Sequence, residues 1–261
     1  MSSAPFQLYV WPNRLLVVGP SHASAAHRHH AAQIACGVDG PVAYQSPHGD
    51  VRRGDLVLIP PDIPHSHDAF GAAAVLYLDA ESAEWRRFRG GHPTSLEALP
   101  FEPGLRILAR RTTRPDMQAA EAFADRLLGA GSAAPAREDA LVVQVRGLVR
   151  ARLEGGITLA SLAAAVHRSP SRLAHRFSEA TGLPLRRYVL WCRLRAAAEA
   201  AMRGASLTEA AHVAGFADSA HLSRTFRATF GIAPSLLFER GRFAVVFCDP
   251  PSSPPIAADV R

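Results

Sequence analysis

The sequence contains no lysine, because all 29 of its basic residues are arginine. It has only three cysteines, Cys36, Cys192 and Cys248, which are too scattered for a zinc-binding pair or a disulfide framework. No apolar run is long enough to cross a membrane. Met1 to Gln7 lacks the basic start and apolar core of a signal peptide. We therefore expect a cytoplasmic protein that does not contact a membrane.

Positive charge is concentrated in one segment of the chain. Residues 1–136 carry 12 arginines against 13 acidic residues, a net charge of −1, whereas residues 137–243 carry 16 arginines against 8, a net charge of +8. Arginine binds phosphates and guanine edges through paired hydrogen bonds, so this segment suits nucleic acid. A solvated basic surface or a GC-rich genome would produce the same composition, so charge only supports this interpretation.

The first hundred residues have the pattern of a small antiparallel β domain. Short apolar runs alternate with glycine, proline and other turn residues, which is typical of a sandwich or barrel. The strands that this pattern predicts are Leu15 to Val18, Ala32 to Cys36, Leu56 to Ile59 and Val75 to Leu78.

After Pro103 the pattern becomes helical. Asp116 to Leu128 carries a narrow apolar stripe at helical spacing, and a Gly/Ala-rich linker follows it. The stripe either pairs with a second copy of the chain or belongs to the protein's own core, and the sequence leaves both open. The end of the chain, with its Pro/Ser run, is expected to be partly disordered.

The C-terminal half contains an internal repeat. LASLAAAVHRSPSRLAHRFSEATGLPL recurs as SLTEAAHVAGFADSAHLSRTFRATFGIAP, and Leu173, Phe177 and Gly182 recur 49 residues later. Each copy predicts a helix, a tight turn and a second helix. The counterparts of Leu173, Phe177 and Gly182 are Leu222, Phe226 and Gly231.

Capping residues mark the second helix of each copy. Ser169 precedes Pro170 in the first copy, and Asp218 is the candidate cap in the second. Gly182 and Gly231 are placed to end these helices in the left-handed conformation. Between the copies, Tyr188 to Met202 is expected to form one long helix.

The tandem pair resembles the DNA-binding domain of AraC/XylS-type transcription regulators. The second copy carries the most specific match, namely Gly215, Phe216, Asp218, Leu222, Arg224, Phe226, Gly231 and Pro234. The chain departs from the family pattern at three positions, where His167 replaces glycine, His175 replaces arginine and Leu237 replaces tyrosine. The resemblance implies an α+β protein with a cupin-like all-β domain over 1–105, a linker helix and flexible linker over 106–136, two helix-turn-helix units over 137–241 and a tail over 242–261.

The resemblance also implies which residues contact DNA. The residues expected to approach base edges are Ser171, Ala174, His175, Ser219, Ala220, Ser223 and Arg224. The residues expected to contact phosphates are Arg172, Arg176 and Arg227. Arg224 is the best candidate for reading a guanine, because arginine contacts O6 and N7 together.

Histidines are concentrated in the N-terminal half, where seven of the 12 precede residue 70. His27, His29 and Gln33 resemble the HxH(x)3E strand of cupins, and Gly54 to His65 resembles the second cupin motif. If they lie on one strand, these three side chains share a face, and His65 would complete a binding site with them. Gln33 stands where metal-binding cupins have a carboxylate and is a poor ligand for most divalent ions. We therefore expect an effector pocket or packed core with no metal and no cofactor, and keep the histidines as the alternative metal ligands.

Three functions fit these features. The first is a regulator that binds double-stranded DNA under the control of a small-molecule effector, as a homodimer and with RNA polymerase as a further partner. The second is a cupin-type metal enzyme with an appended DNA-binding module. The third is a regulator whose N-terminal domain only dimerises. We predict the first, without enzymatic activity, because no catalytic constellation accompanies the histidines.

Overall fold

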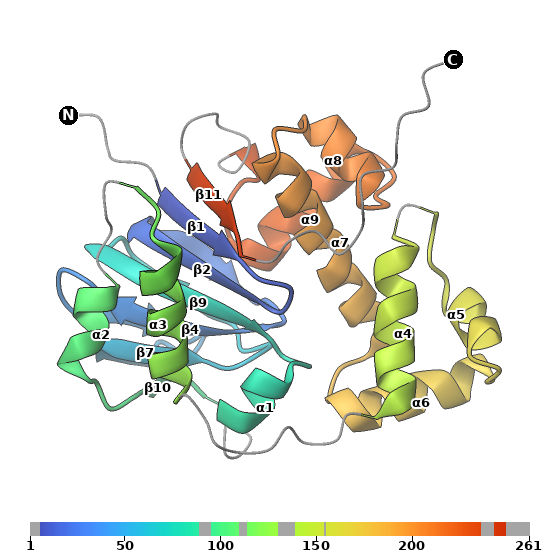
Figure 1. The fold of residues 1–261 in the computed structure, drawn as a ribbon, viewed down its shortest axis with the longest axis horizontal. Coiled ribbons are helices and arrows are strands. Elements are labelled where there is room, and N and C mark those ends of the chain that lie inside the picture. Colours follow the sequence, from blue (N-terminus) through green and yellow to red (C-terminus); the bar gives the residue numbers. More distant parts are fainter. Residues whose placement is uncertain are drawn as a thin grey trace.

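A computed structural model describes residues 6–88, 95–109, 114–129, 139–153, 155–235 and 243–248. The chain forms a β domain and a helical half that lie against each other (Figure 1). The α+β class and the order of the two parts are as the sequence predicts.

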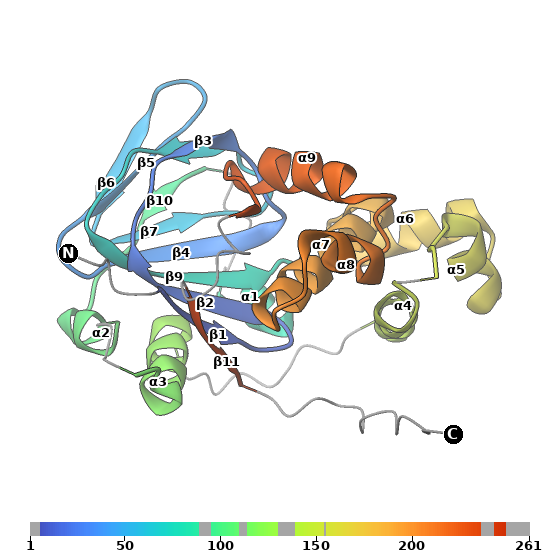
Figure 2. The ribbon, with the colours of Figure 1, turned by 90° about the horizontal axis from the view of Figure 1, so that it is seen from above.

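Two sheets build the N-terminal domain, and Figure 2 shows them facing each other. A seven-stranded sheet has the order β10-β7-β4-β9-β2-β1-β11, and a four-stranded sheet has the order β3-β8-β5-β6. The strands are β1 (Phe6–Val10), β2 (Arg14–Pro20), β3 (Ser24–His27), β4 (Ala31–Gly37), β5 (Val42–Gln45), β6 (Val51–Gly54), β7 (Leu56–Ile59), β8 (His65–His67), β9 (Ala72–Asp79), β10 (Glu97–Ala98) and β11 (Phe243–Phe247).

Alternation along β4 and β7 divides the side chains between the two faces of the large sheet. Ile34 and Leu58 belong to the core on the outer face, whereas Ala35 and Ile59 belong to the core between the sheets. Gln33 has the same parity as Ala35, so its amide points into the space between the sheets. All four strands predicted from sequence are present in this sheet.

Helices cover the outer face of the large sheet (Figure 1). They are α1 (Ala83–Phe88), α2 (Pro103–Leu108) and α3 (Met117–Leu128). Phe123 and Leu127 of α3 are buried in the core that this face forms with the sheet. Most of this stripe therefore belongs to the protein's own core, and pairing of the helix with a second chain stays a prediction.

The helical half contains α4 (Ala140–Ala151), α5 (Leu159–Ala165), α6 (Pro170–Thr181), α7 (Leu185–Met202), α8 (Leu207–Val213) and α9 (Ser219–Phe230). The long helix expected from Tyr188 is α7, which begins three residues earlier, after Pro184. Buried residues lie all round α7, as expected of a helix packed on several sides. No described helix is long and apolar enough to span a membrane.

Strand β11 is a feature that the sequence analysis missed. Phe243–Phe247 pairs in parallel with β1 in full register, although the segment was assigned to a partly disordered tail. Its apolar, β-branched composition is typical of a strand, but only the distant partner β1 makes it one. The flexible linker, the terminal Pro/Ser run and Leu237 lie outside the described residues.

Candidate DNA-binding surface and interdomain cavity

The first helix-turn-helix unit consists of α5 and α6. Thr158 and Ser161 form a capping box at the start of α5, and the Ser169 hydroxyl accepts a hydrogen bond from the Arg172 amide at 3.4 Å. Gly182 ends α6 in the left-handed conformation with φ 75°. Leu173 and Phe177 are fully buried, so the predicted caps and core pair are confirmed.

The second unit, α8 and α9, repeats this construction. Asp218 accepts a hydrogen bond from the His221 amide at 2.5 Å, and Gly231 ends α9 with φ 68°. Leu222 and Phe226 are buried with α8 and the C-terminal part of α7. In Figure 1 helix α7 runs between the two units.

The turns of the two units have the same backbone conformation despite different residues. Gly215 in the second unit has φ 73°, and His167 at the equivalent position of the first has φ 52°. A non-glycine residue rarely adopts this left-handed conformation. His167, which stands where the family has glycine, therefore adopts the strained left-handed conformation, and the turn keeps its shape.

The residues predicted to read bases lie at the surface of α6 and α9. Exposed side chains are those of Ser171, His175, Ala220 and Arg224, and half-buried ones are those of Ala174, Ser219 and Ser223. The Ser223 hydroxyl donates to the Ser219 carbonyl at 2.8 Å, which leaves its oxygen as an acceptor. No predicted base-reading residue is sealed in the core.

The predicted phosphate contacts differ in how they are paired. Arg172 and Arg227 are exposed and form no ion pair with any residue that the structure describes. Arg176 lies 2.8 Å from Asp139 and 2.9 Å from Glu179. Asp139 also caps α4 through the Leu141 amide, so Arg176 ties α6 to α4, a role that the sequence analysis missed.

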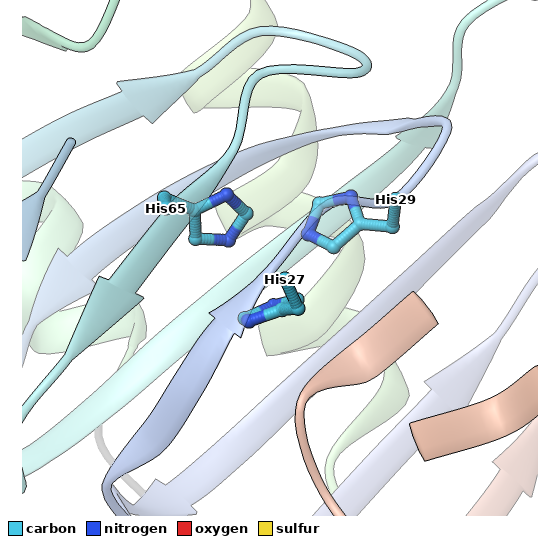
Figure 3. A group of neighbouring side chains, drawn as sticks. All are labelled: His27, His29 and His65. Atoms are coloured by element: carbon cyan, nitrogen blue, oxygen red, sulfur yellow. The ribbon is translucent and has the colours of Figure 1, made fainter. Parts of the chain in front are cut away.

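In the N-terminal domain, the predicted histidines come together from different elements. Figure 3 shows the rings of His27, His29 and His65 facing one another, and a ring nitrogen from each lies within 4.8 Å of the others. The expectation that His27, His29 and Gln33 share one strand is wrong. His27 ends β3, His29 lies in the following turn and Gln33 lies in β4, so it is the turn that directs His29 inward.

Hydrogen bonds show which ring nitrogens are engaged. The Nδ1 atoms of the three histidines lie 2.8–2.9 Å from the carbonyls of Ala25, Ala31 and Ile63. Burial lowers the pKa of His29 to about 4 and that of His65 to about 2, so both rings are neutral near pH 7. Each then donates its one proton from Nδ1 and keeps a lone pair on Nε2.

Gln33 competes with a metal for His29. Its side-chain oxygen is placed 2.9 Å from His29 Nε2, and its side-chain nitrogen is placed 2.8 Å from the Tyr44 hydroxyl. Because a neutral His29 has no proton on Nε2, the amide must be turned so that its NH2 group donates there and its oxygen accepts from Tyr44. Three imidazoles suit zinc or a similar ion, but this network occupies one of their lone pairs.

A cavity of about 260 Å³ lies between the two halves of the protein. Strands contribute apolar side chains such as Leu8, Val17 and Val75, and the helical half contributes Trp191 of α7 and Phe230 of α9. The set predicted as an effector pocket is thus only partly at the cavity, because His27 and Gln33 line it and His29 and His65 lie behind them. The sequence analysis missed the helical wall.

The end of α9 approaches the β domain closely. Phe230 packs against Trp191 and His29, with ring centroids 6.1 and 6.4 Å apart. A Cβ atom on Gly231 would lie 2.7 Å from the Ala25 carbonyl oxygen and from His27 Nδ1. Both its positive φ and this approach therefore require glycine at residue 231.

Asp79 at the end of β9 joins the two halves. Its carboxylate accepts a hydrogen bond from Trp191 Nε1 at 2.8 Å and lies 2.6 Å from an Arg195 nitrogen. Arg195 also donates to the carbonyls of Trp11 and Pro12. These bonds fix α7 to the edge of the β domain with charged groups that are largely withdrawn from solvent.

Glu81 lies beside this junction and is 1% exposed. Burial, followed by the nearby Asp79 carboxylate, raises the pKa of Glu81 to about 7. Its Oε2 is buried without a hydrogen-bond partner among the described residues. His30 Nε2 lies 4.0 Å from Glu81, so the junction contains a carboxyl group that changes charge near neutral pH.

The model of the family described as "Helix-turn-helix domain" matches residues 162–240, from α5 through α9. This protein carries an AraC-type DNA-binding domain. No curated protein matches the chain.

Solved structures are similar to this chain in fold. An apo variant of ToxT from Vibrio cholerae has a TM-score of 0.61 at 15% identity, covering 87% of this chain and 98% of that one. Unsaturated fatty acid-bound ToxT has a TM-score of 0.56 at 15% identity, covering 87% and 96%. A Chromobacterium violaceum regulator with an AraC-type domain is 24% identical over 38% of this chain and 88% of its own, with a TM-score of 0.36.

The likeness to ToxT is one of fold and extends over both halves. Together with the family match, it shows a chain that carries a C-terminal helix-turn-helix domain of the AraC type behind an N-terminal β domain.

We predict that Gln33→Glu converts the histidine cluster into a metal site. The variant supplies a carboxylate ligand and removes the amide that bonds His29, so it should retain about one zinc per chain after dialysis. Wild-type protein should retain far less, as measured by mass spectrometry of the metal content. The double variant with His65→Ala is the control and should lose the zinc. Stoichiometric zinc in the wild type would contradict the interpretation of Gln33.

We predict that Glu81→Gln removes a pH dependence of stability. The pKa of Glu81 is higher in the native state than in the unfolded chain. The protonated carboxyl group therefore contributes fully to the free energy of unfolding below about pH 4.5, and this contribution is lost as pH rises to about 7. In urea unfolding, the variant should be more stable than wild type by about 1–3 kcal/mol at pH 8 and equal to it near pH 4.5. As a control, the exposed variant Glu97→Gln should have the same free energy of unfolding as wild type at both pH values. If Glu81→Gln also matches wild type at pH 8, burial of the Glu81 carboxylate does not destabilise the native state.

Proposed function

We propose that this AraC-type regulator binds operator DNA through α6 and α9 and is controlled by a small molecule held in the cavity between its halves. The observation that carries the proposal is that α9, the second DNA-reading helix, also forms part of the cavity wall through Phe226 and Phe230. A ligand there contacts the β domain and the reading helix at once.

On DNA, the two reading helices are proposed to enter neighbouring major grooves, about 34 Å apart along the duplex. The surface residues of α6 and α9 named above then face base edges, with Arg224 on a guanine. Arg172 and Arg227, which have no acidic partner among the described residues, would bind phosphates. Arg176 would reach a phosphate only by leaving Asp139 or Glu179, so it is a weaker candidate for a phosphate contact than Arg172 and Arg227.

Control by a ligand follows from linkage. A molecule that binds the cavity more tightly in one arrangement of the halves shifts the population toward that arrangement, and DNA and ligand then change each other's affinity by the same factor. ToxT, which has this fold, is described as binding an unsaturated fatty acid, and that supports an effector here. Gln33 in place of a metal-ligating carboxylate supports a regulator without enzymatic activity.

The partners are proposed to be double-stranded DNA, a small-molecule effector and, at the promoter, RNA polymerase. A homodimer stays a prediction, and most of the apolar stripe of α3 is buried in its own domain.

Arg224→Ala is predicted to weaken operator binding by about 1–3 kcal/mol and to relax the preference at one base pair. The operator is first recovered by pulling down genomic DNA with the purified protein, and anisotropy titrations then compare it with single-base variants. Arg227→Ala is the matched control, because loss of a phosphate contact weakens all sequences equally. An equal loss on all sequences for Arg224→Ala would assign that residue to a phosphate.

Val17→Phe is predicted to change operator affinity at least about threefold, because the larger side chain fills the cavity and displaces the end of α9. The substitution lies on β2, far in sequence from the residues that read DNA. Val51→Phe, at an exposed position of β6, is the matched control and should leave affinity unchanged. If Val17→Phe folds, as checked by circular dichroism, and binds the operator like wild type, the cavity does not communicate with α9.

A further inference from the structure

The charges that line the cavity are paired with one another or with neighbouring residues. Among the described lining residues, the two arginines are Arg14 and Arg195. Arg14 lies 3.5 Å from Glu84 and 3.4 Å from Asp125, and it stacks on Trp11. Arg195 is held by Asp79 at 2.6 Å and by Glu199 at 3.5 Å. Each guanidinium therefore has a carboxylate beside it. Arg14 Nε has no hydrogen-bond partner among the described residues, but it is buried and presents no surface to an incoming anion.

Two of the lining histidines already turn a ring nitrogen toward a backbone carbonyl. His27 Nδ1 lies 2.8 Å from the Ala25 carbonyl oxygen, and His67 Nδ1 lies 3.0 Å from the Asp68 carbonyl oxygen, so neither nitrogen is available to an incoming anion. The remaining lining histidine, His22, is exposed and packs against Phe6. A carboxylate inside the cavity would therefore meet Asp79 and Glu199 and would have to displace one of them from Arg195.

Hydroxyl groups in the wall lack partners. The Ser21 and Ser24 oxygens are buried without a hydrogen bond to any described residue. Tyr77 makes none within the described part of the chain either, and burial raises the pKa of its hydroxyl to about 12. All three lie in the cavity lining. Buried hydroxyls normally find a partner. Rotation of the Ser21 or Ser24 side chain toward the cavity would bring its hydroxyl to an uncharged hydrogen-bonding group of a ligand, so this wall matches a ligand that carries such a group.

We propose that the effector of this protein is an uncharged, largely apolar molecule with an alcohol, carbonyl or amide group, and not a carboxylic acid. This rests on the proposed function of the cavity as the effector site. The apolar part lies along the strand wall and the aromatic side chains of α7 and α9, and the neutral polar group meets the unpartnered hydroxyls. The protein thereby differs from ToxT, whose described ligands include a fatty acid and a substituted butenoic acid.

The test compares probes that differ only in the head group. Decan-1-ol, decanamide and decanoate are titrated into the full chain at pH 7.5 with EDTA present, so that the histidines hold no metal. Quenching of tryptophan fluorescence reports binding, because Trp191 lines the cavity, and Trp191→Phe identifies that signal. We expect the alcohol and the amide to bind at least about tenfold tighter than decanoate, since a tenfold preference corresponds to about 1.4 kcal/mol.

A variant in which Arg195 loses its carboxylate partner is the matched control. Asp79→Asn is isosteric and leaves Arg195 short of a carboxylate, so it should narrow or reverse the preference by tightening decanoate alone. Glu199→Gln, at a more exposed position, tests the same point if Asp79→Asn fails to fold.

Two outcomes overturn the inference. Decanoate binding as tightly as the neutral probes in wild-type protein refutes the ligand class and leaves the effector site standing. If none of the probes binds and Val17→Phe leaves operator affinity unchanged, the effector site itself is refuted, while DNA binding through Arg224 is unaffected.

Discussion

The carboxylate of Asp79 holds the two halves of this regulator together. It accepts a hydrogen bond from Trp191 and pairs with Arg195, both on α7, and α7 connects the two helix-turn-helix units. A buried acid is tolerated at such a place only when it is paired and hydrogen-bonded. This charged contact at the end of β9, together with the bonds from Arg195 to the Trp11 and Pro12 carbonyls, helps to set the position of α7, and with it of α9 over the cavity.

The two helix-turn-helix units share a backbone and differ in chemistry. The second has glycine in its turn and an exposed Arg224 without an acidic partner among the described residues. The first has His167 strained into the same turn and an Arg176 committed to Asp139 and Glu179. The second unit is thus better equipped for base reading, and it is also the unit whose helix reaches the cavity. In the proposed function, α9 therefore contacts both the DNA and the effector.

The N-terminal domain brings three histidines together in an environment that disfavours charge. Gln33 links His29 to Tyr44 through a neutral amide, burial keeps the histidines uncharged, and the arginines at the cavity are paired. Desolvation explains why these groups are either neutral or paired, because a low-dielectric pocket disfavours each unpaired charge. The same physics underlies the proposal that the pocket takes an uncharged ligand.

Sequence alone determined the parts that depend on local chemistry. Ser169, Asp218, Gly182 and Gly231 delimit the reading helices through caps and left-handed termini that any chain with these residues would form. Tertiary structure alone decided the parts that depend on distant partners. Phe243–Phe247 becomes a strand only beside β1, the α3 stripe is buried only by its own sheet, and the cavity exists only where Phe230 meets the β domain. Short-range propensities record no such contacts, because each joins residues far apart in the chain.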